Sequence, residues 1–467
     1  MAHSPPRGNI ERKDDRMANT KDMTSGNPAK LILFFTLPLI AGNIFQQLYG
    51  FIDTLLVGRF LGVEALAAVG CTGPIMFLLV GCIMGLTAGL TIITGQRFGA
   101  KDMEGVRRSA AACVLIAMAT SLLTAFIGGY FAREILLWMD TPLDIIDGAE
   151  DFIAIVVGGS PLFSTFIVGA NLLRALGDSR HPTIFLATSL CINIVLEPLF
   201  LLVFEWGIPG AAWAMIVSQF LGGLIAWIYI WRKVPALRIQ RQDWQVDWPF
   251  LWQHIRVGMP MAFQTSIIAI GAVILQVALN GLGPISVAAF SAAQKVETIA
   301  LMPMMSFGIA MAAYTAQNYG AGKFNRIRQG VNQCIMMSGS FSIAVGFFNI
   351  ICGSWLMHLF IGDAAPEVVE LGQVYLTTTG CCYWILALLF IYRNTLQGLG
   401  KSFVPTFAGV MELVMRAAVA LGLVSSLGFW GATLASPAAW IGSCVPLTIA
   451  FYYTVRKMKK QGQLAEN

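Results

Sequence analysis

Charged residues are scarce in this chain: they make up 12% of its 467 residues, whereas hydrophobic residues make up 57%. A soluble protein of this size keeps roughly a quarter of its residues charged. Because the deficit runs along the whole length, it excludes a soluble globular protein and indicates a polytopic membrane protein. The net charge of +5 comes from short basic loops, with no interleaved aromatic residues, so we expect a lipid bilayer and no nucleic acid as partner.

Motifs for metals, disulfides and nucleotides are also missing. The nine cysteines show no CxxC or paired spacing, and the four histidines are scattered without the spacing of a metal site. The sequence contains no GxxxxGK[ST] loop to hold phosphates and no constellation of a nucleophile with a base. We therefore expect no enzyme, no metal and no cofactor, and any active process would draw on an ion gradient.

Apolar segments long enough to cross a bilayer recur along the chain, separated by Gly, Pro and charged residues. They predict an all-α polytopic membrane protein with about twelve transmembrane helices of ~20 residues each. The predicted spans lie near 31–57, 66–93, 109–131, 151–173, 183–204, 210–231, 255–279, 287–316, 331–352, 370–392, 404–426 and 434–455.

Basic residues are distributed unevenly over the loops that these spans define. Of the 30 lysines and arginines, only Arg59 and Arg133 fall in one set of alternate loops, and only Lys295 and Arg416 fall inside spans. All others, Arg174 and Arg393 included, are assigned to the opposite loops or to the tails. By the positive-inside rule, this bias predicts a multi-pass protein of the plasma membrane with both termini in the cytoplasm.

The chain repeats itself. Residues Thr94–Ala100 resemble Thr315–Ala321 at an offset of 221, and Asn171–Ser179 resemble Asn394–Ser402 at an offset of 223. Each half holds an even number of spans, so the two point the same way and are related by an axis along the membrane normal. The sequence predicts two pseudo-symmetric six-helix lobes, with the following organisation: a disordered cytoplasmic tail (1–27), an N-lobe (28–231), a cytoplasmic linker (232–254), a C-lobe (255–456) and a second cytoplasmic tail (457–467).

Six ionisable residues lie inside the predicted spans: Asp53, Glu197, Lys295, Glu297, Glu412 and Arg416. A charged side chain at the centre of a bilayer costs on the order of 2.5–3.5 kcal/mol, so such residues are usually functional or paired. Two of the acids, Asp53 and Glu197, have no acidic counterpart at the repeat-related positions of the second half. This asymmetry favours a functional role for the pair.

Glu197 lies four residues after Asn193, so the two share one helix face. Pro198 removes a backbone donor and frees a carbonyl near that face. Asp53 and Glu197 both fall in the outer half of the bilayer and could meet there. Burial favours a neutral carboxyl and suits proton uptake, whereas the same oxygens together with Asn193 could instead bind Na⁺.

The remaining polar residues in spans allow structural and functional interpretations. Glu412 and Arg416 are four residues apart, and we expect a structural ion pair. For Lys295 and Glu297 the two interpretations stay open. The residues considered for substrate binding or coupling are Glu297, Lys295, Gln47, Gln264, Tyr383 and Trp384.

Several blocks of the sequence resemble the multidrug and toxic compound extrusion (MATE) family. They are Leu37-Pro38, the run Tyr49–Thr54, Gly99-Ala100, Gly320-Ala321 and the block Asn171–Ser179. The resemblance extends from about Leu31 to Lys460. It implies twelve helices in two lobes and the export of organic cations in exchange for H⁺ or Na⁺ by alternating access, by a protein expected to be a monomer.

The resemblance also implies an ion site in the N-lobe, made of Asp53, Asn193 and Glu197. Met215 stands where the family often has a threonine, and the acids that sodium-coupled members carry in spans seven and ten are missing here. These departures favour proton coupling. The alternative function is a lipid-linked oligosaccharide flippase, or another lipid flippase, of the same superfamily, which would need basic residues in the central cavity.

Overall fold

The computed structural model describes residues 21–139, 141–361 and 366–461, in which helices alternate with short connections and no strand occurs. The helices of the first half are α1 (Pro28–Leu61), α2 (Val63–Cys71), α3 (Gly73–Gly99), α4 (Met103–Tyr130), α5 (Ala132–Trp138), α6 (Leu143–Gly158), α7 (Ser160–Ala175), α8 (Arg180–Pro198) and α9 (Gly207–Lys233). Those of the second half are α10 (Trp248–Asn280), α11 (Pro284–Gly320), α12 (Phe324–Ile361), α13 (Pro366–Gly380), α14 (Tyr383–Gly398), α15 (Phe403–Gly422), α16 (Val424–Leu427) and α17 (Phe429–Lys460).

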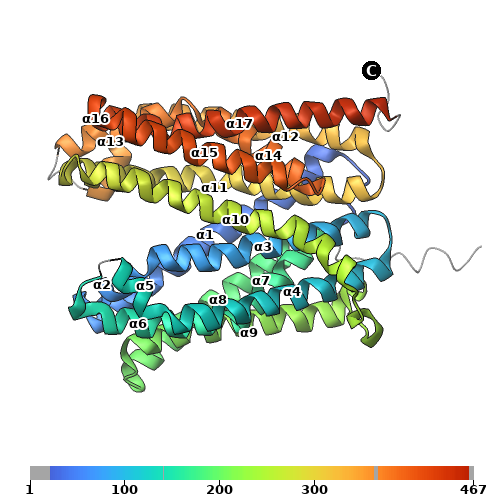
Figure 1. Cartoon of the computed structure of the whole chain (residues 1–467), viewed down its shortest axis with the longest axis horizontal. Coiled ribbons are helices and arrows are strands. Elements are labelled where there is room, and N and C mark those ends of the chain that lie inside the picture. The colour runs from blue at the N-terminus through green and yellow to red at the C-terminus, as the bar shows by residue number, and fades with distance from the viewer. Residues whose placement is uncertain (1–20, 140, 362–365, 462–467) are drawn as a thin grey trace, which may run out of the picture.

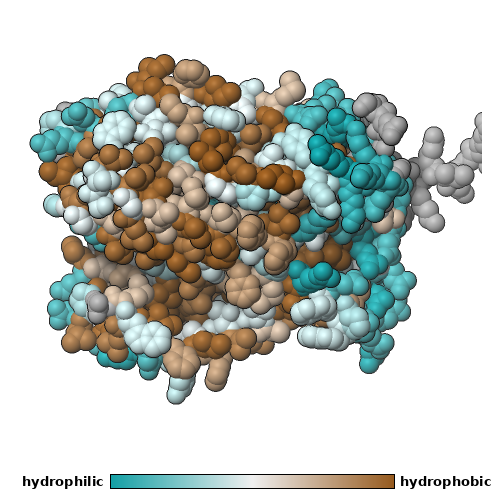
Figure 2. Space-filling model, turned by 45° about the horizontal axis from the view of Figure 1, so that its top comes forward, coloured by the Kyte–Doolittle hydropathy of each residue, from teal (hydrophilic) through white to brown (hydrophobic). Residues whose placement is uncertain are grey.

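Twelve membrane crossings account for these helices. Ten helices among the described residues are long and apolar enough to span a bilayer, and the pairs α6–α7 and α13–α14 each complete one further span. Apolar side chains cover the middle of the molecule, and hydrophilic residues gather at its two ends (Figure 2). The prediction of an all-α protein with twelve spans is therefore confirmed.

The fourth and tenth spans are broken, although the sequence predicted continuous helices there. Their halves meet at angles of 48° and 50°. The first break lies at Gly159, and Pro161 directly after it lacks the N–H that would continue the α-helical bonding. The second lies at Cys381 and Cys382, the repeat-related place in the other half. The internal repeat thus reproduces a bend as well as a helix order.

The two lobes exchange helix halves. Figure 1 shows α1 and α10 running between the first-half and second-half helices. The beginning of α1, including Ile32 and Phe35, lies in a hydrophobic core of second-half residues, whereas Val57 near its end packs in the first half. Ala262 near the beginning of α10 packs in a first-half core, and Leu275 packs in the second half. Each lobe is therefore completed by half a helix from the other repeat.

The lobes are joined at the end of the molecule that carries the basic loops, called here the basic end. Gln96 Nε2 donates to the Gly398 carbonyl, and Gln317 Nε2 donates to the Ala175 carbonyl, both at 2.9 Å. The glutamines occupy repeat-related positions, and so do the carbonyls that they contact. A Cβ on Gly99 would collide with the Gln317 carbonyl, and one on its counterpart Gly320 would collide with the Gln96 carbonyl. Glycine at these two positions is what allows the backbones to meet.

The expected N-terminal tail is partly ordered. Residues 1–20 lie outside the described residues, but Met23 is fully buried against α11, where its N–H donates to Gln317 Oε1 at 2.9 Å and its carbonyl accepts from Asn318 Nδ2 at 3.1 Å. Lys323 Nζ donates to the Thr24 carbonyl at 2.8 Å. The prediction of disorder is thus wrong for residues 21–27, because Met23 is buried against α11 and anchors this otherwise polar segment.

Candidate functional site in the first lobe

The carboxyls of Asp53 and Glu197 face each other in the first lobe, from α1 and α8. Asp53 retains 9% of its side-chain exposure, and Glu197 and Asn193 retain none. The two carboxyls interact with each other, and Glu197 also interacts with Asn193 on the preceding turn of α8. The structure therefore brings together the three residues that the sequence suggested as an ion site.

Polar atoms of these residues lack conventional partners. Asp53 Oδ1, both carboxylate oxygens of Glu197 and both polar atoms of the Asn193 amide are buried without a hydrogen-bond partner among the described residues. Buried polar atoms are nearly always hydrogen-bonded, because an unpaired one costs about 1–3 kcal/mol. A proton shared between the acids, or a small hard cation, would satisfy oxygens of this kind.

Helix α9 supplies polar neighbours that the sequence did not reveal. The Tyr49 hydroxyl lies one turn before Asp53 on α1, contacts Ser218 Oγ at 2.6 Å, and interacts with both acids and with Gln219. Gln219 is four residues beyond Met215, so its side chain occupies the same face of α9 as the expected threonine ligand. Uncharged polar residues are common enough in spans that nothing in the sequence singled out Ser218 and Gln219.

The backbone beside Glu197 is irregular. Helix α8 ends at Pro198 and continues as a π-helical turn, Leu199–Val203. Proline cannot donate the N–H that a regular helix needs, and π turns occur frequently at functional sites. This local distortion places the acid at the end of a regular helix, where the neighbouring segment can rearrange.

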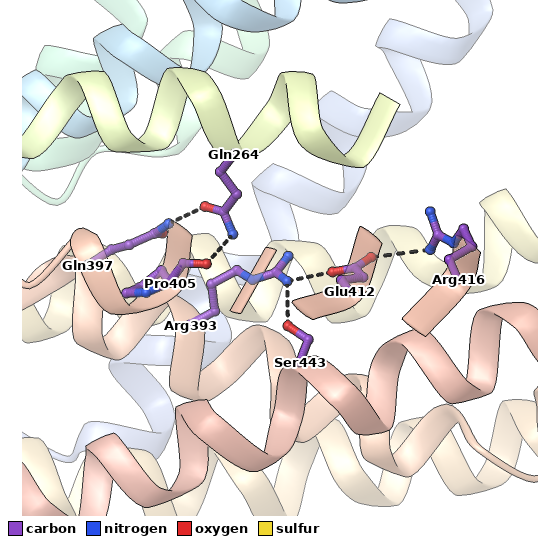
Figure 3. A network of polar contacts seen from close by, with 7 residues as sticks. All are labelled: Gln264, Arg393, Gln397, Pro405, Glu412, Arg416 and Ser443. Atoms are coloured by element: carbon purple, nitrogen blue, oxygen red, sulfur yellow. Dashed lines mark hydrogen bonds and ion pairs between the residues drawn. The ribbon is translucent and has the colours of Figure 1, made fainter. Parts of the chain in front are cut away.

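A second buried charge cluster lies in the other lobe (Figure 3). Glu412 Oε1 accepts from Arg416 Nη2 at 3.2 Å, so these residues lie together as the expected pair. Glu412 Oε2 also accepts from Arg393 Nη2 at 2.8 Å, and that Arg393 nitrogen contacts Ser443 Oγ at 3.1 Å. Assigning Arg393 to a cytoplasmic loop was wrong: it lies inside α14, 7% exposed, where Glu412 stabilises its charge.

The other residues considered for binding or coupling do not gather in one place. Glu297 is buried and accepts a 2.7 Å hydrogen bond from the Tyr375 hydroxyl, whereas Lys295 on the same helix is exposed. Gln47 and Trp384 are exposed as well. The other two are buried within the second lobe: Tyr383 accepts from Asn349 Nδ2 at 3.2 Å, and Gln264 bridges Gln397 and the Pro405 carbonyl (Figure 3).

Two cavities lie where helices of the two halves meet. One of about 330 Å³ is lined by α1, α11 and α12, mostly with apolar side chains such as Ile44, Met302 and Phe348. The other, of about 80 Å³, lies nearer the basic end, between α3, α7, α10, α11 and α14. Neither is lined by Asp53 or Glu197, so the acid pair and the cavities are separate features.

A family model, MatE, matches residues 38–199 and again residues 260–421. The chain belongs to the MATE family. The second match begins 222 residues after the first, at the offset found within the sequence, so each lobe is one copy of the family's unit. Members of this family are transporters, and the chain is a multi-pass membrane protein.

Individual MATE relatives resemble the chain over most of its length. "Probable multidrug resistance protein YpnP" of Bacillus subtilis (strain 168) is 29% identical and covers 81% of this chain and 84% of its own. A protein of Shewanella oneidensis named "FAD transporter" is 25% identical over 95% and 97%. A solved structure described as the outward-facing conformation of a multidrug resistance MATE family transporter superposes with a TM-score of 0.85 at 21% identity, covering 95% of this chain and 98% of its own. These relatives support multidrug efflux transport and confirm the two-lobe fold.

Proposed function

We propose that this MATE protein is a secondary active antiporter that exports cationic or amphipathic organic compounds through the plasma membrane in exchange for protons. The observation that carries the proposal is the buried pair Asp53–Glu197, in which Asp53 Oδ1 and both oxygens of Glu197 lack a hydrogen-bond partner among the described residues. Two carboxyls in one buried site cannot both be ionised cheaply, so the pair exchanges a proton more readily than a single exposed acid.

Proton entry would drive export through the packing of α1 and α8. When the pair is charged, repulsion and desolvation favour an arrangement that hydrates it; when the pair is neutral, the two helices can pack tightly. For a substrate without net charge, one inward proton gains roughly 2.3 kcal/mol per 100 mV of membrane potential. That energy supports a substrate gradient of about fifty-fold.

The orientation belongs to the same proposal. The basic end faces the cytoplasm, both termini lie there, and the glutamine contacts between the lobes close the cytoplasmic side. The arrangement then corresponds to an outward-facing state, which receives protons from outside and releases substrate there.

The decisive experiment imposes the two gradients separately on proteoliposomes containing the purified protein and ethidium. We expect a proton gradient directed into the liposomes to drive ethidium out of them, and a sodium gradient at constant pH to have no effect. Transport that follows the sodium gradient and ignores pH would overturn proton coupling.

A second candidate cargo is a flavin nucleotide, because one full-length relative is named an FAD transporter. The same proteoliposomes loaded with FAD test it through flavin fluorescence. Flipping of a lipid-linked sugar is less well supported, since Arg416 is paired with Glu412, Lys295 does not line either cavity, and a single arginine, Arg174, lines the smaller one.

A further inference from the structure

The smaller cavity between the lobes is centred on the repeat axis. Its walls include repeat-related pairs, one residue from each lobe: Ala88 with Ile309, Thr91 with Ala312, Ile92 with Ala313, Gly95 with Ala316 and Asn171 with Asn394. Directly beyond it towards the basic end lie the glutamine contacts that close the molecule. The cavity therefore lies between the two lobes, directly next to the contacts that join them at the basic end.

One cation breaks this symmetry. Arg174 lines the cavity, and its repeat counterpart, Gln397, does not, because Gln397 is engaged with Gln264 inside the second lobe (Figure 3). The cavity is thus lined by a guanidinium from the first lobe and by none from the second.

The guanidinium of Arg174 is poorly satisfied. Its one hydrogen bond within the described residues runs from Nη1 to Asn171 Oδ1 at 3.2 Å, and Nε is buried without an acceptor. No aspartate or glutamate lines the cavity. Elsewhere among the described residues, the buried arginines Arg393 and Arg416 share a glutamate. Arg174 is partly buried, and a cation at such a site without a counter-charge is costly, for which the usual compensation is an anion.

We propose that Arg174, with Asn171, Thr91 and Asn394 around it, binds the anionic group of the transported molecule, a carboxylate or a phosphate. The cavity of about 80 Å³ accommodates such a group but not a drug-sized molecule, which needs several hundred Å³. The other walls are apolar, so the group belongs to an amphipathic molecule whose body extends between the lobes. This inference rests on the proposed transport function and extends its cargo to organic anions and zwitterions.

The test compares ligands with and without the anionic group. Binding of norfloxacin and its methyl ester, and of dodecyl phosphate and dodecanol, is measured by titration calorimetry with the purified full-length protein. We expect at least one ligand that carries the anionic group to bind about ten- to a hundredfold more tightly than its partner without it, as charge-assisted hydrogen bonds imply. The pair that shows the preference identifies the source as a drug-like carboxylate or a lipid-like phosphate. No preference in either pair would overturn the proposal.

Variants separate binding from folding. Arg174→Gln should remove the preference, and Arg174→Lys should retain part of it. Thr91→Asp, which places a carboxylate on the wall of the cavity that Arg174 lines, should also remove the charge preference. The ligand without the anionic group should still bind this variant. Arg97→Gln is the matched control, because Arg97 lies at the same end but is paired with Asp102 and does not line the cavity. A preference that survives in both Arg174→Gln and Thr91→Asp contradicts the assignment.

The measurement needs no ion gradient, so its outcome is independent of proton coupling. A protein that shows the charge preference but no pH-driven export would retain this inference and lose the proposed antiport. A protein that exports ethidium in exchange for protons, but binds both members of each ligand pair equally, would retain the proposed antiport and lose this inference.

Discussion

Asp53 is the residue whose chemistry is easiest to isolate. Asp53→Asn keeps the size and polarity of the side chain but cannot release or bind a proton, so we expect proton-driven export to fall to background in vesicles, with normal membrane insertion. Glu197→Gln should behave likewise because the acids act as a pair. Asp102→Asn is the matched control: Asp102 caps α4 at the basic end, asparagine also caps well, and export should persist. Wild-type export by Asp53→Asn would refute the mechanism.

The buried triad of Arg393, Glu412 and Arg416 in the second lobe is expected to contribute to stability and not to coupling. Removing one partner of a buried charge cluster leaves an uncompensated charge and typically costs about 3–5 kcal/mol. Glu412→Gln should therefore lower the thermal unfolding temperature of the detergent-solubilised protein markedly, since it leaves Arg393 without an ion-pair partner among the described residues and Arg416 with only the electrostatic attraction of Glu297. Arg133→Gln, which removes exposed ion pairs with Asp147 and Glu150, should change it little. Equal shifts for the two variants would contradict the triad's role.

For single residues, the sequence was informative where an ionisable side chain falls inside an apolar segment. Asp53 and Glu197 could be proposed because an acid in a lipid-buried span is costly and their repeat counterparts are apolar. Arg393 was misplaced because it sits one turn before a loop, and only its distance to Glu412 shows that it points inwards. Gln219 could not be singled out because the rotation of α9 relative to α1 depends on packing between helices far apart in sequence.

At the scale of helices, the contact between α3 and α11 depends on the absence of side chains. A Cβ at Gly99 would collide with the Gln317 carbonyl, so Gly99→Ala should hold the lobes apart at the basic end. We expect faster hydrogen exchange in peptides covering residues 96–100 and 317–321. Gly129→Ala is the control, because a Cβ there meets nothing within 4 Å. Unchanged exchange in Gly99→Ala would mean that the backbones adjust without separating.

Hydropathy predicted where helices lie but not how they bend or pair. The break at Gly159 falls at Gly158-Gly159-Ser160-Pro161, a breaker sequence that hydropathy alone passes over, whereas the break at Cys381 falls in an apolar segment without proline. The exchange of α1 and α10 between lobes is likewise invisible in hydropathy, since both surroundings of each helix are apolar. It follows from contacts such as those of Ile32 with the second-lobe core.

At the scale of the whole molecule, the helix exchange links the lobes at one end and leaves the other end less constrained. The first halves of α1 and α10 and the ordered segment around Met23 all cross between lobes at the basic end. Opening that end requires these contacts to break together, whereas Asp53 of the acid pair lies in the second half of α1, away from the basic end. Coupling between the two ends must therefore pass along α1, whose Pro38 removes one backbone hydrogen bond between the basic end and Asp53.

Charge predicts which end of the molecule faces the cytoplasm. The described part of the basic end carries Lys101, Lys323, Lys401 and the tail lysines, whereas Arg133 is neutralised by two acids at the opposite end. Because basic loops are retained in the cytoplasm, a C-terminal green fluorescent protein fusion should fluoresce, and alkaline phosphatase fused there should be inactive. Phosphatase inserted after Trp138, between α5 and α6, should be active. The opposite pattern would place the basic end outside and contradict the proposed orientation.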